Sequence, residues 1–238
     1  MSLAAPAPVV FLVDVDNTLL DNDRVTADLQ RHLDETVGPE GRARYWAIFE
    51  QLRVELGYAD YLGALQRYRL EFPRDLRLLT VSGFLVDYPF ANRLFPGALD
   101  VLDRFRNWGP TAILSDGNVA FQPRKVTRAG LAERVDSVLI YVHKERELDD
   151  VEQRYPANHY VLVDDKLRVL TAVKRVRGPR VTTVFARQGH YAHDPDTLAT
   201  NPAADLTVER IGDLVDYDLS TLRARAFARA GAGPGSGR

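Results

Sequence analysis

The acidic, hydroxyl and lysine side chains of this chain recur in an order that suits chemistry on a phosphate group. The run FLVDVDNT carries Asp14 and Asp16 two positions apart. Further candidates follow at wide intervals, in the order Ser115, Lys144, Asp164 and Asp165. Several carboxylates in one site repel each other, and a hard cation such as Mg²⁺ relieves that repulsion. A phosphate monoester suits such a site, because metal and lysine offset its charge while a hydroxyl donates a hydrogen bond.

Two carboxyl groups can divide the reaction between them. A carboxylate held near phosphorus can attack it and form an aspartyl-phosphate. A second carboxyl group two residues further along can protonate the leaving oxygen and later deprotonate water. The set of residues therefore matches the needs of phosphoryl transfer, with Mg²⁺ as the cofactor.

Most of these side chains directly follow short apolar runs, which are typical of buried parallel strands. The runs are Val9–Val13, Thr111–Leu114, Val138–Val142, Tyr160–Val163, Val181–Phe185 and a weaker Leu206–Val208. Helical patterns between them end at glycines, and these patterns are Ala98–Trp108, Pro123–Ala129 and Lys166–Arg177. Strands that alternate with helices predict an α/β fold with a Rossmann-like, doubly wound parallel sheet. Ligands bind outside the carboxyl ends of such strands, which is where the candidate residues fall.

One long segment, from about Asp23 to Pro89, has helical periodicity and no convincing strand. Tyr45, Phe49, Leu52 and Leu56 form one apolar stripe at helical spacing. A segment of this length is too long for a loop, so we expect an inserted all-α subdomain. The expected division is a core of residues 1–21 and 90–230, a helical insertion at 22–89, and a disordered, glycine-rich tail at 231–238.

The composition excludes several classes of protein. The 238 residues are 45% hydrophobic, carry a formal net charge of -2 and contain no cysteine. Disulfides, thiolate metal sites and a cysteine nucleophile are therefore excluded, and no basic surface for nucleic acid is expected. No apolar run approaches the roughly 20 residues that span a bilayer, and the start of the chain lacks the basic region of a signal peptide. We expect a cytoplasmic monomer or homodimer that binds a small phosphorylated metabolite, without nucleic-acid or membrane partners.

The order of these motifs resembles that of the haloacid dehalogenase (HAD) superfamily. Asp14-Val15-Asp16-Asn17-Thr18 is similar to its first motif, DxDx[TV], and Ser115 after an apolar strand looks like the second. Lys144 looks like the third motif, and Val163-Asp164-Asp165 like the acidic fourth. The resemblance implies a Rossmann-like core with a helical cap of the C1 type, inserted between the first and second motifs.

The resemblance also implies a role for each matching residue. Asp14 would be the nucleophile and a metal ligand, and Asp16 the general acid/base whose backbone carbonyl faces Mg²⁺. Lys144 would pair with the nucleophile and the phosphate, and Asp165 with Asp164 would complete the metal site. The phosphoryl group would be held by Ser115 and the backbone N–H groups of Asp116 and Gly117, with Thr18 supporting the loop geometry. An aspartate at position 16 favours the phosphatase branch, because the family's dehalogenases carry a non-acidic residue there and use no metal.

Several assignments have alternatives. Lys125 is the rival of Lys144, but its position inside a predicted helix makes it less suitable. Either Asp164 or Asp165 can ligate the metal while the other caps the following helix, and we favour Asp165 as the direct ligand. His190 and His193 suggest zinc only weakly, since no third ligand is nearby.

Other functions remain open on the sequence. The motifs do not separate hydrolysis from phosphoryl transfer to a sugar phosphate, as in a phosphotransferase or phosphomutase. A receiver-like signalling domain uses similar residues, but it places its acidic pair before the phospho-accepting aspartate, whereas Asp14 comes first here. An inactive scaffold is disfavoured because all four motifs are intact.

Overall fold

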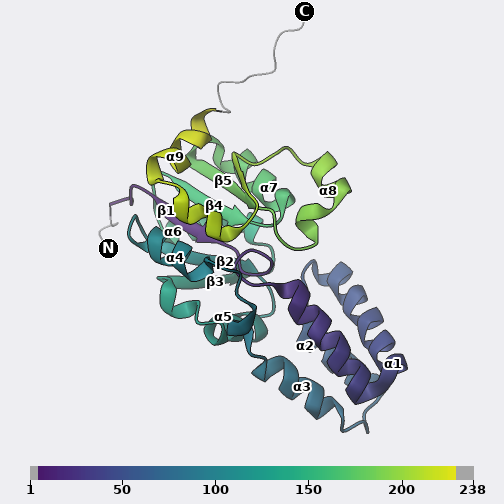
Figure 1. Cartoon of the computed structure of the whole chain (residues 1–238). Helices are drawn as coiled ribbons and strands as arrows, with labels where there is room; N and C mark the ends of the chain where they lie inside the picture. Colours follow the sequence, from purple (N-terminus) through teal and green to yellow (C-terminus); the bar gives the residue numbers. More distant parts are fainter. Residues whose placement is uncertain (1–4, 229–238) are drawn as a thin grey trace, which may run out of the picture.

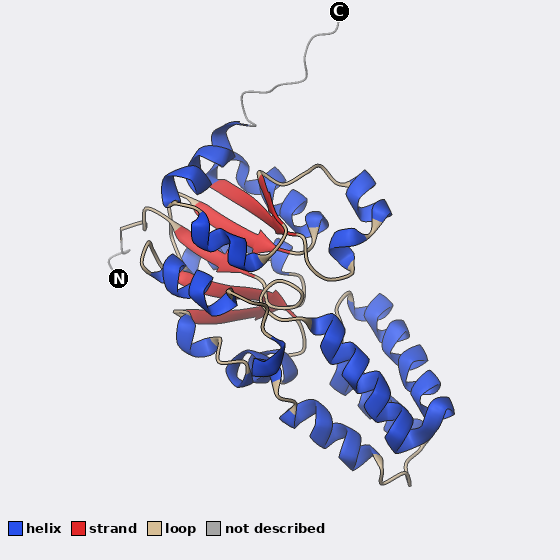
Figure 2. Ribbon diagram, viewed as in Figure 1, coloured by secondary structure: helices blue, strands red, loops and turns tan. Residues whose placement is uncertain are grey.

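The computed structural model describes residues 5–228, whose core is a six-stranded parallel sheet (Figure 2). The strands are β1 (Val10–Val13), β2 (Thr111–Asp116), β3 (Ser137–Tyr141), β4 (Tyr160–Asp164), β5 (Val181–Ala186) and β6 (Leu206–Val208). They lie in the order β3-β2-β1-β4-β5-β6, and every neighbouring pair is parallel. The predicted α/β fold is confirmed, and β1 lies at the centre of the sheet with β2 and β4 beside it.

The strands have no polar face, because helices cover both sides of the sheet. Alternate residues of β1 enter two separate hydrophobic clusters: Phe11 and Val13 belong to one, and Val10 and Leu12 to the other. On the first side the ring of Phe11 stacks on Phe105 with centroids 4.2 Å apart. This two-sided burial explains why each strand reads as a continuous apolar run.

The helices of the core connect consecutive strands or flank them. They are α4 (Ala98–Arg106), α5 (Phe121–Arg128), α6 (Leu148–Arg154), α7 (Leu167–Arg177), α8 (Pro195–Thr200) and α9 (Leu219–Ala228). Short 3-10 turns lie at Phe90–Arg93, Ala132–Arg134, Lys144–Arg146, Gly178–Arg180, Tyr191–His193 and Ile211–Asp216. Residues of α4 and α5 contribute to the cluster that contains Phe11, whereas α6 and α7 cover the opposite side.

Three further helices form the insertion after β1 and project from the core at the carboxyl end of the sheet (Figure 1). They are α1 (Asn22–Leu56), α2 (Tyr61–Glu71) and α3 (Leu78–Asp87). The predicted stripe on α1 is buried at Tyr45, Phe49 and Leu52. Tyr45 donates a hydrogen bond to the backbone carbonyl of Tyr61 at 2.9 Å, which ties α1 to the start of α2. The predicted all-α cap is therefore confirmed.

The ends of the chain lie largely outside this description. The tail predicted to be disordered, residues 231–238, falls beyond the described residues. Within residues 5–228, no helix is both long enough and apolar enough to cross a membrane.

Candidate active site

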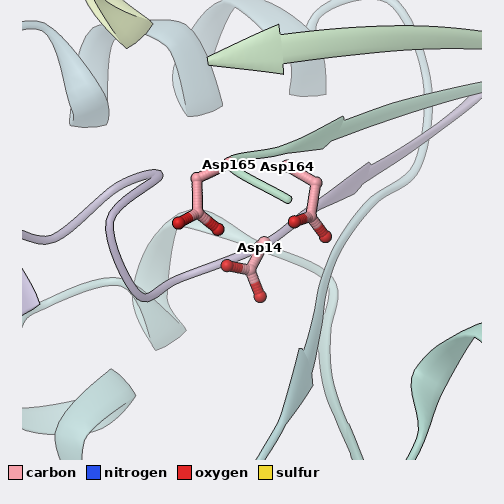
Figure 3. A group of neighbouring side chains, drawn as sticks. All are labelled: Asp14, Asp164 and Asp165. Carbon is pink, nitrogen blue, oxygen red and sulfur yellow. The ribbon is translucent and has the colours of Figure 1, made fainter. Parts of the chain in front are cut away.

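Three buried carboxylates meet where β1 and β4 end (Figure 3). Asp14 follows β1, Asp164 is the last residue of β4, and Asp165 comes next. Their side chains each offer an oxygen within 4.8 Å of the others. The sheet register produces this meeting, because Val13 pairs with Val163 and the next residue of each strand therefore emerges at the same edge. All three thus lie at strand ends, as the sequence pattern predicts.

A lysine partly neutralises this cluster. Lys144 Nζ lies 2.5 Å from Asp14 Oδ1 and 2.6 Å from Asp164 Oδ2, and the three side chains are almost fully buried. Burial opposes ionisation of Asp14, but the charges of Lys144 and Lys166 outweigh it and lower the pKa of Asp14. Burial likewise opposes the charge on Lys144, but the neighbouring carboxylates raise its pKa. The two lysine charges thus favour the ionised form of Asp14.

Asp165 has no such partner. Both of its carboxylate oxygens are buried, and neither accepts a hydrogen bond from any described residue. Burial raises the pKa of Asp165 well above its usual range, and the charge of Lys166, which acts in the opposite direction, does not offset this effect. A buried carboxylate without a partner is relieved either by a proton or by a cation. An oxygen cluster with two free oxygens on Asp165 fits Mg²⁺, which takes one or two carboxylates and keeps several waters.

Asp164 is engaged differently from its neighbour. Its Oδ1 accepts the backbone N–H of Lys166 at 2.8 Å, and its Oδ2 pairs with Lys144. Burial raises the pKa of Asp164 despite the lysine. Asp165 thus has two oxygens without a hydrogen-bond donor among the described residues, whereas the one such oxygen of Asp164 lies in the ion pair with Lys144.

Asp16 lies beside this cluster but is not one of its members. Its Oδ1 is 2.6 Å from Lys125 Nζ, and its Oδ2 accepts a hydrogen bond from Gln122 Nε2 at 3.1 Å. Its side chain is 25% exposed, in contrast to the buried Asp14. Lys144 is thus the lysine against Asp14, as expected, and Lys125 pairs with Asp16. The location of Lys125 on a helix does not remove it from the site, because its buried ammonium group reaches Asp16 from α5.

The residues expected to hold a phosphoryl group are close by. Ser115 Oγ accepts a hydrogen bond from Gln122 Nε2 at 3.1 Å, and Thr18 Oγ1 donates to Asp14 Oδ2 at 3.5 Å. Asp116 anchors the turn that carries Lys144, because its Oδ1 accepts the backbone N–H of this lysine at 2.7 Å. Burial raises the pKa of Asp116. The N–H of Gly117 is already donated to the carbonyl of Tyr141 at 3.1 Å.

A cavity of about 650 Å³ extends from this centre between cap and core. The core side is lined by Asp16, Asn17, Asp116, Gln122, Lys125, Asp165, Lys166, Arg168, His190, Tyr191 and Thr197. The cap side includes Trp46, Phe49, Arg53, Tyr58 and Tyr61. Because the aromatic residues of the cap recur at helical spacing, the sequence predicts that they lie in the core of the cap. Tyr45 and Tyr68 are buried in this way, and so are Phe49 and Tyr61, although these two also line the cavity with Trp46, Arg53 and Tyr58.

The two histidines after β5 lie in a loop. His190 Nδ1 is 2.5 Å from Asp23 Oδ1 near the start of α1, and His190 lines the cavity. His193 is exposed in the next turn. The part of the chain that the structure describes contains one group of His, Asp or Glu side chains that could hold a metal, and neither histidine belongs to it.

Three residues of the site were missed by the sequence analysis. Gln122 bridges Asp16 and Ser115, Asn22 accepts a hydrogen bond from Lys125, and Lys166 lies over the ring of Tyr191, with Nζ 5.6 Å from the centroid. Burial opposes the charge on Lys166, but Asp165 and Asp14 raise its pKa. Lys166 could have been predicted as a site residue, because it directly follows the acidic end of β4. Gln122 and Asn22 gave no signal, because amides on helices are common.

Comparison with known proteins adds to this geometry. A family model described as haloacid dehalogenase-like hydrolase matches residues 9–176. A solved structure from Burkholderia xenovorans LB400, described as a haloacid dehalogenase-like hydrolase, is 63% identical, and the match covers 90% of this chain and 100% of that one with a TM-score of 0.86.

More distant solved structures share the fold. The L-2-haloacid dehalogenase of Xanthobacter autotrophicus is 19% identical over 88% of this chain and 97% of that chain, with a TM-score of 0.58. The HAD-hydrolase YfnB of Bacillus subtilis, solved with bound magnesium, is 15% identical over 87% and 97% of the two chains, with a TM-score of 0.57. A search of curated proteins returns no match.

Proposed function

Because the chain belongs to the haloacid dehalogenase-like hydrolases, we propose that it hydrolyses a small phosphate monoester in a Mg²⁺-dependent reaction. The observation that carries the proposal is the second carboxylate of the first motif. Asp16 lines the cavity two residues after the buried Asp14, and its Oδ2 accepts a hydrogen bond from the same Gln122 amide that contacts Ser115 Oγ, instead of joining the metal cluster. A carboxyl group in this position suits proton transfer to and from a substrate that enters from the cavity.

In the proposed reaction, an oxygen of Asp14 attacks phosphorus and the bond between phosphorus and the leaving oxygen breaks. Asp16 donates its proton to that leaving oxygen, so the product alcohol leaves neutral. In the second half, Asp16 takes a proton from water, whose oxygen attacks the aspartyl-phosphate and releases inorganic phosphate and Asp14. Lys144 holds Asp14 in place by its ion pair and adds a positive charge beside the phosphoryl group.

The cation would be held by Asp14 and Asp165, with Asp164 beside them. Once bound, it would neutralise the carboxylates and polarise the phosphoryl oxygens. The two free oxygens of Asp165 support this assignment, because they have no hydrogen-bond donor among the described residues. Ser115 would donate a hydrogen bond to a phosphoryl oxygen, and its Oγ is held by Gln122.

The test compares two kinds of hydrolysis on one purified protein. With Mg²⁺ we expect phosphate release from 4-nitrophenyl phosphate and from some members of a panel of phosphorylated metabolites, and no release in excess EDTA. Asp14→Asn should abolish turnover with the fold retained, whereas Asp100→Asn, on an exposed position of α4, should not affect it. Chloride release from 2-chloropropionate without metal, together with no phosphate release, would replace the proposal with dehalogenation. Transfer of the phosphoryl group to a sugar phosphate instead of water would assign a phosphotransferase.

A further inference from the structure

A chain of hydrogen bonds connects Asp16 to the cap. Lys125 Nζ donates to Asp16 Oδ1 at 2.6 Å and to Asn22 Oδ1 at 3.1 Å. Asn22 Nδ2 in turn donates to Tyr61 Oη at 3.2 Å, and Tyr61 Oη lies 2.9 Å from Thr26 Oγ1. The chain therefore runs from the loop after β1, through α5, to the first turns of α1 and α2.

Lys125 is confined at the centre of this chain. Its side chain is 1% exposed, and its Nζ lies 5.4 Å from the centroid of Phe121 and 5.9 Å from that of Phe90. A buried ammonium group is costly unless charges and acceptors surround it. Asp16 supplies the charge, Asn22 supplies a second acceptor, and the two rings supply cation–π contacts. The position of Nζ is thus fixed jointly by the core and by the cap.

This confinement determines which oxygen of Asp16 is available for proton transfer. A lysine ammonium group is a hydrogen-bond donor only, so Oδ1 must act as an acceptor. The other oxygen, Oδ2, accepts a hydrogen bond only from the neutral Nε2 amide of Gln122, which also donates to Ser115 Oγ at 3.1 Å, so Oδ2 is outside the ion pair and can carry the proton. Oδ2 is therefore the oxygen on the side of the residue that would bind the phosphoryl group.

We propose that Lys125 is a positioning residue that holds Asp16 with Oδ2 turned toward the leaving oxygen, and that its contact with Asn22 and Tyr61 links this orientation to the position of the cap. The inference rests on the proposed phosphohydrolase reaction. Tyr61 also lines the cavity, so the cap wall against which a substrate would lie is part of the same hydrogen-bonded chain.

The consequence is a specific dependence on the leaving group. When the phosphorus–oxygen bond breaks, its electron pair goes to the leaving oxygen, which takes the proton from Asp16 Oδ2. The phenolate of a strongly acidic phenol is a good leaving group without this proton. The phenolate of a weakly acidic phenol is a poor leaving group and needs the proton. Loss of Lys125 should therefore slow the hydrolysis of esters of weakly acidic phenols far more than the hydrolysis of esters of strongly acidic phenols.

The experiment measures kcat/KM for a series of para-substituted phenyl phosphates, from 4-nitrophenyl to 4-methoxyphenyl, because kcat/KM covers only the steps up to loss of the phenol. Wild type should depend weakly on the acidity of the phenol. In Lys125→Met the 4-methoxyphenyl ester should slow by about 10²-fold or more, the lower bound for general acid–base catalysis, and the 4-nitrophenyl ester much less. Tyr61→Phe removes only a hydroxyl group. It should make kcat/KM depend more strongly on the acidity of the phenol, as in Lys125→Met, but the change in the slope of this dependence should be smaller.

Lys174→Met is the matched control, because Lys174 Nζ forms a 2.7 Å ion pair with Asp205 away from the cavity. It should leave the slope unchanged. A crystal structure of Lys125→Met gives an independent readout, in which the Asp16 carboxylate should leave its contact with Gln122. An equal loss for all esters in Lys125→Met, or the same change of slope in Lys174→Met, would overturn the positioning role. Failure of the proposed function is distinguishable, because wild type would then hydrolyse none of the esters.

Discussion

Charge compensation at the ends of β1 and β4 is uneven from residue to residue. Lys144 contacts Asp14 and Asp164, while both oxygens of Asp165 are without a hydrogen-bond donor among the described residues. A buried pair stabilises its members only while both partners are present. The ion pairs of Lys144 therefore stabilise the folded protein, whereas the buried carboxylate of Asp165 destabilises it. Single substitutions at Lys144 and at Asp165 should have opposite effects on stability.

Asp165→Asn should raise the thermal stability of the metal-free protein and abolish stabilisation by Mg²⁺. Burial raises the pKa of Asp165 above the usual 3.8, so the folded protein binds a proton that the unfolded chain has lost. The resulting destabilisation is absent below pH 3.8 and grows as the pH rises toward the folded pKa. Asparagine cannot ionise, so the advantage of the variant should widen with pH.

Calorimetry in EDTA and in Mg²⁺ across about pH 5 to 8 measures both effects, with about 2–4 °C in Tm for each kcal/mol in a chain of this size. Asp100→Asn serves as the exposed control. A variant that is less stable than wild type at every pH, or one that still gains stability from Mg²⁺, would contradict this account.

Lys144→Met should be more damaging to stability than Lys125→Met. It leaves Asp14 and Asp164 buried beside each other without their cation, and breaking a buried pair costs about 3–5 kcal/mol. Asp16 keeps a side chain that is 25% exposed, so water can solvate it when Lys125 is lost. Urea unfolding measures the free energy of unfolding of both variants. A larger decrease in Lys125→Met than in Lys144→Met would contradict this prediction, because it would mean that leaving the buried Asp14 and Asp164 without their cation costs less than leaving the partly exposed Asp16 without its own.

At the scale of elements, α1 shows how backbone conformation shapes the cap. It is a helix of 35 residues interrupted at Gly38, whose φ of 83° and ψ of 171° are not helical, directly before Pro39. Proline cannot continue the hydrogen-bond pattern of the preceding turn, and glycine is the residue that tolerates the left-handed φ. The interruption allows the second half of α1, with Tyr45 and Phe49, to pack against α2.

Gly38→Ala should therefore destabilise the protein by about 1–3 kcal/mol, the usual strain of a side chain in this backbone region. Gly83→Ala on α3 is a close control, because a Cβ at either glycine would meet no atom within 4 Å and only Gly38 has positive φ. At Gly83 the change should be neutral or stabilising, by about 0.5–1 kcal/mol. Chemical denaturation of both variants measures the difference, and equal effects would remove backbone conformation as the cause.

At the scale of the whole molecule, cap and core enclose the cavity and meet through polar contacts around it. His190 contacts Asp23 near the start of α1, and Arg53 Nη1 lies 3.4 Å from Tyr191 Oη near its end. At the start of α2, Asn118 Nδ2 donates to the buried Asp60 at 3.0 Å. These three contacts therefore hold the cap against the core on several sides of the cavity.

Asn118→Asp should weaken the contact between cap and core selectively. The new carboxylate still accepts the N–H groups of Ala120 and Phe121, as Asn118 Oδ1 does at 2.9 Å and 3.0 Å. Opposite the Asp60 carboxylate, however, it replaces a donor with a like charge, and the two carboxylates repel each other across the contact between cap and core. Faster hydrogen exchange at the first turn of α2 and a raised KM are expected. Asn158→Asp, on an exposed position, is the control for added charge, and unchanged exchange in Asn118→Asp would contradict a role of this contact in holding the cap.

The sheet, the cap and the acidic residues at the strand ends could be predicted from the amino-acid sequence alone. Each predicted strand lies within one residue of the observed one at both ends, except that β2 runs two residues further, to Asp116, because parallel strands buried on both faces must be largely apolar. Asp14, Ser115, Asp164 and Asp165 could be placed for the same reason: a polar residue directly after such a run must lie at the carboxyl edge of the sheet.

The pairing of side chains within the site, in contrast, follows from the three-dimensional packing of the helices against the sheet. Lys125 and Gln122 reach Asp16 from a helix more than a hundred residues away, and Asn22 joins them from the cap. Nothing in the local pattern distinguishes such residues from ordinary helix residues, because their role depends on how α5 and α1 pack against β1. The same holds for Asp165, whose oxygens accept no hydrogen bond from a described residue although Lys144 pairs with both Asp14 and Asp164.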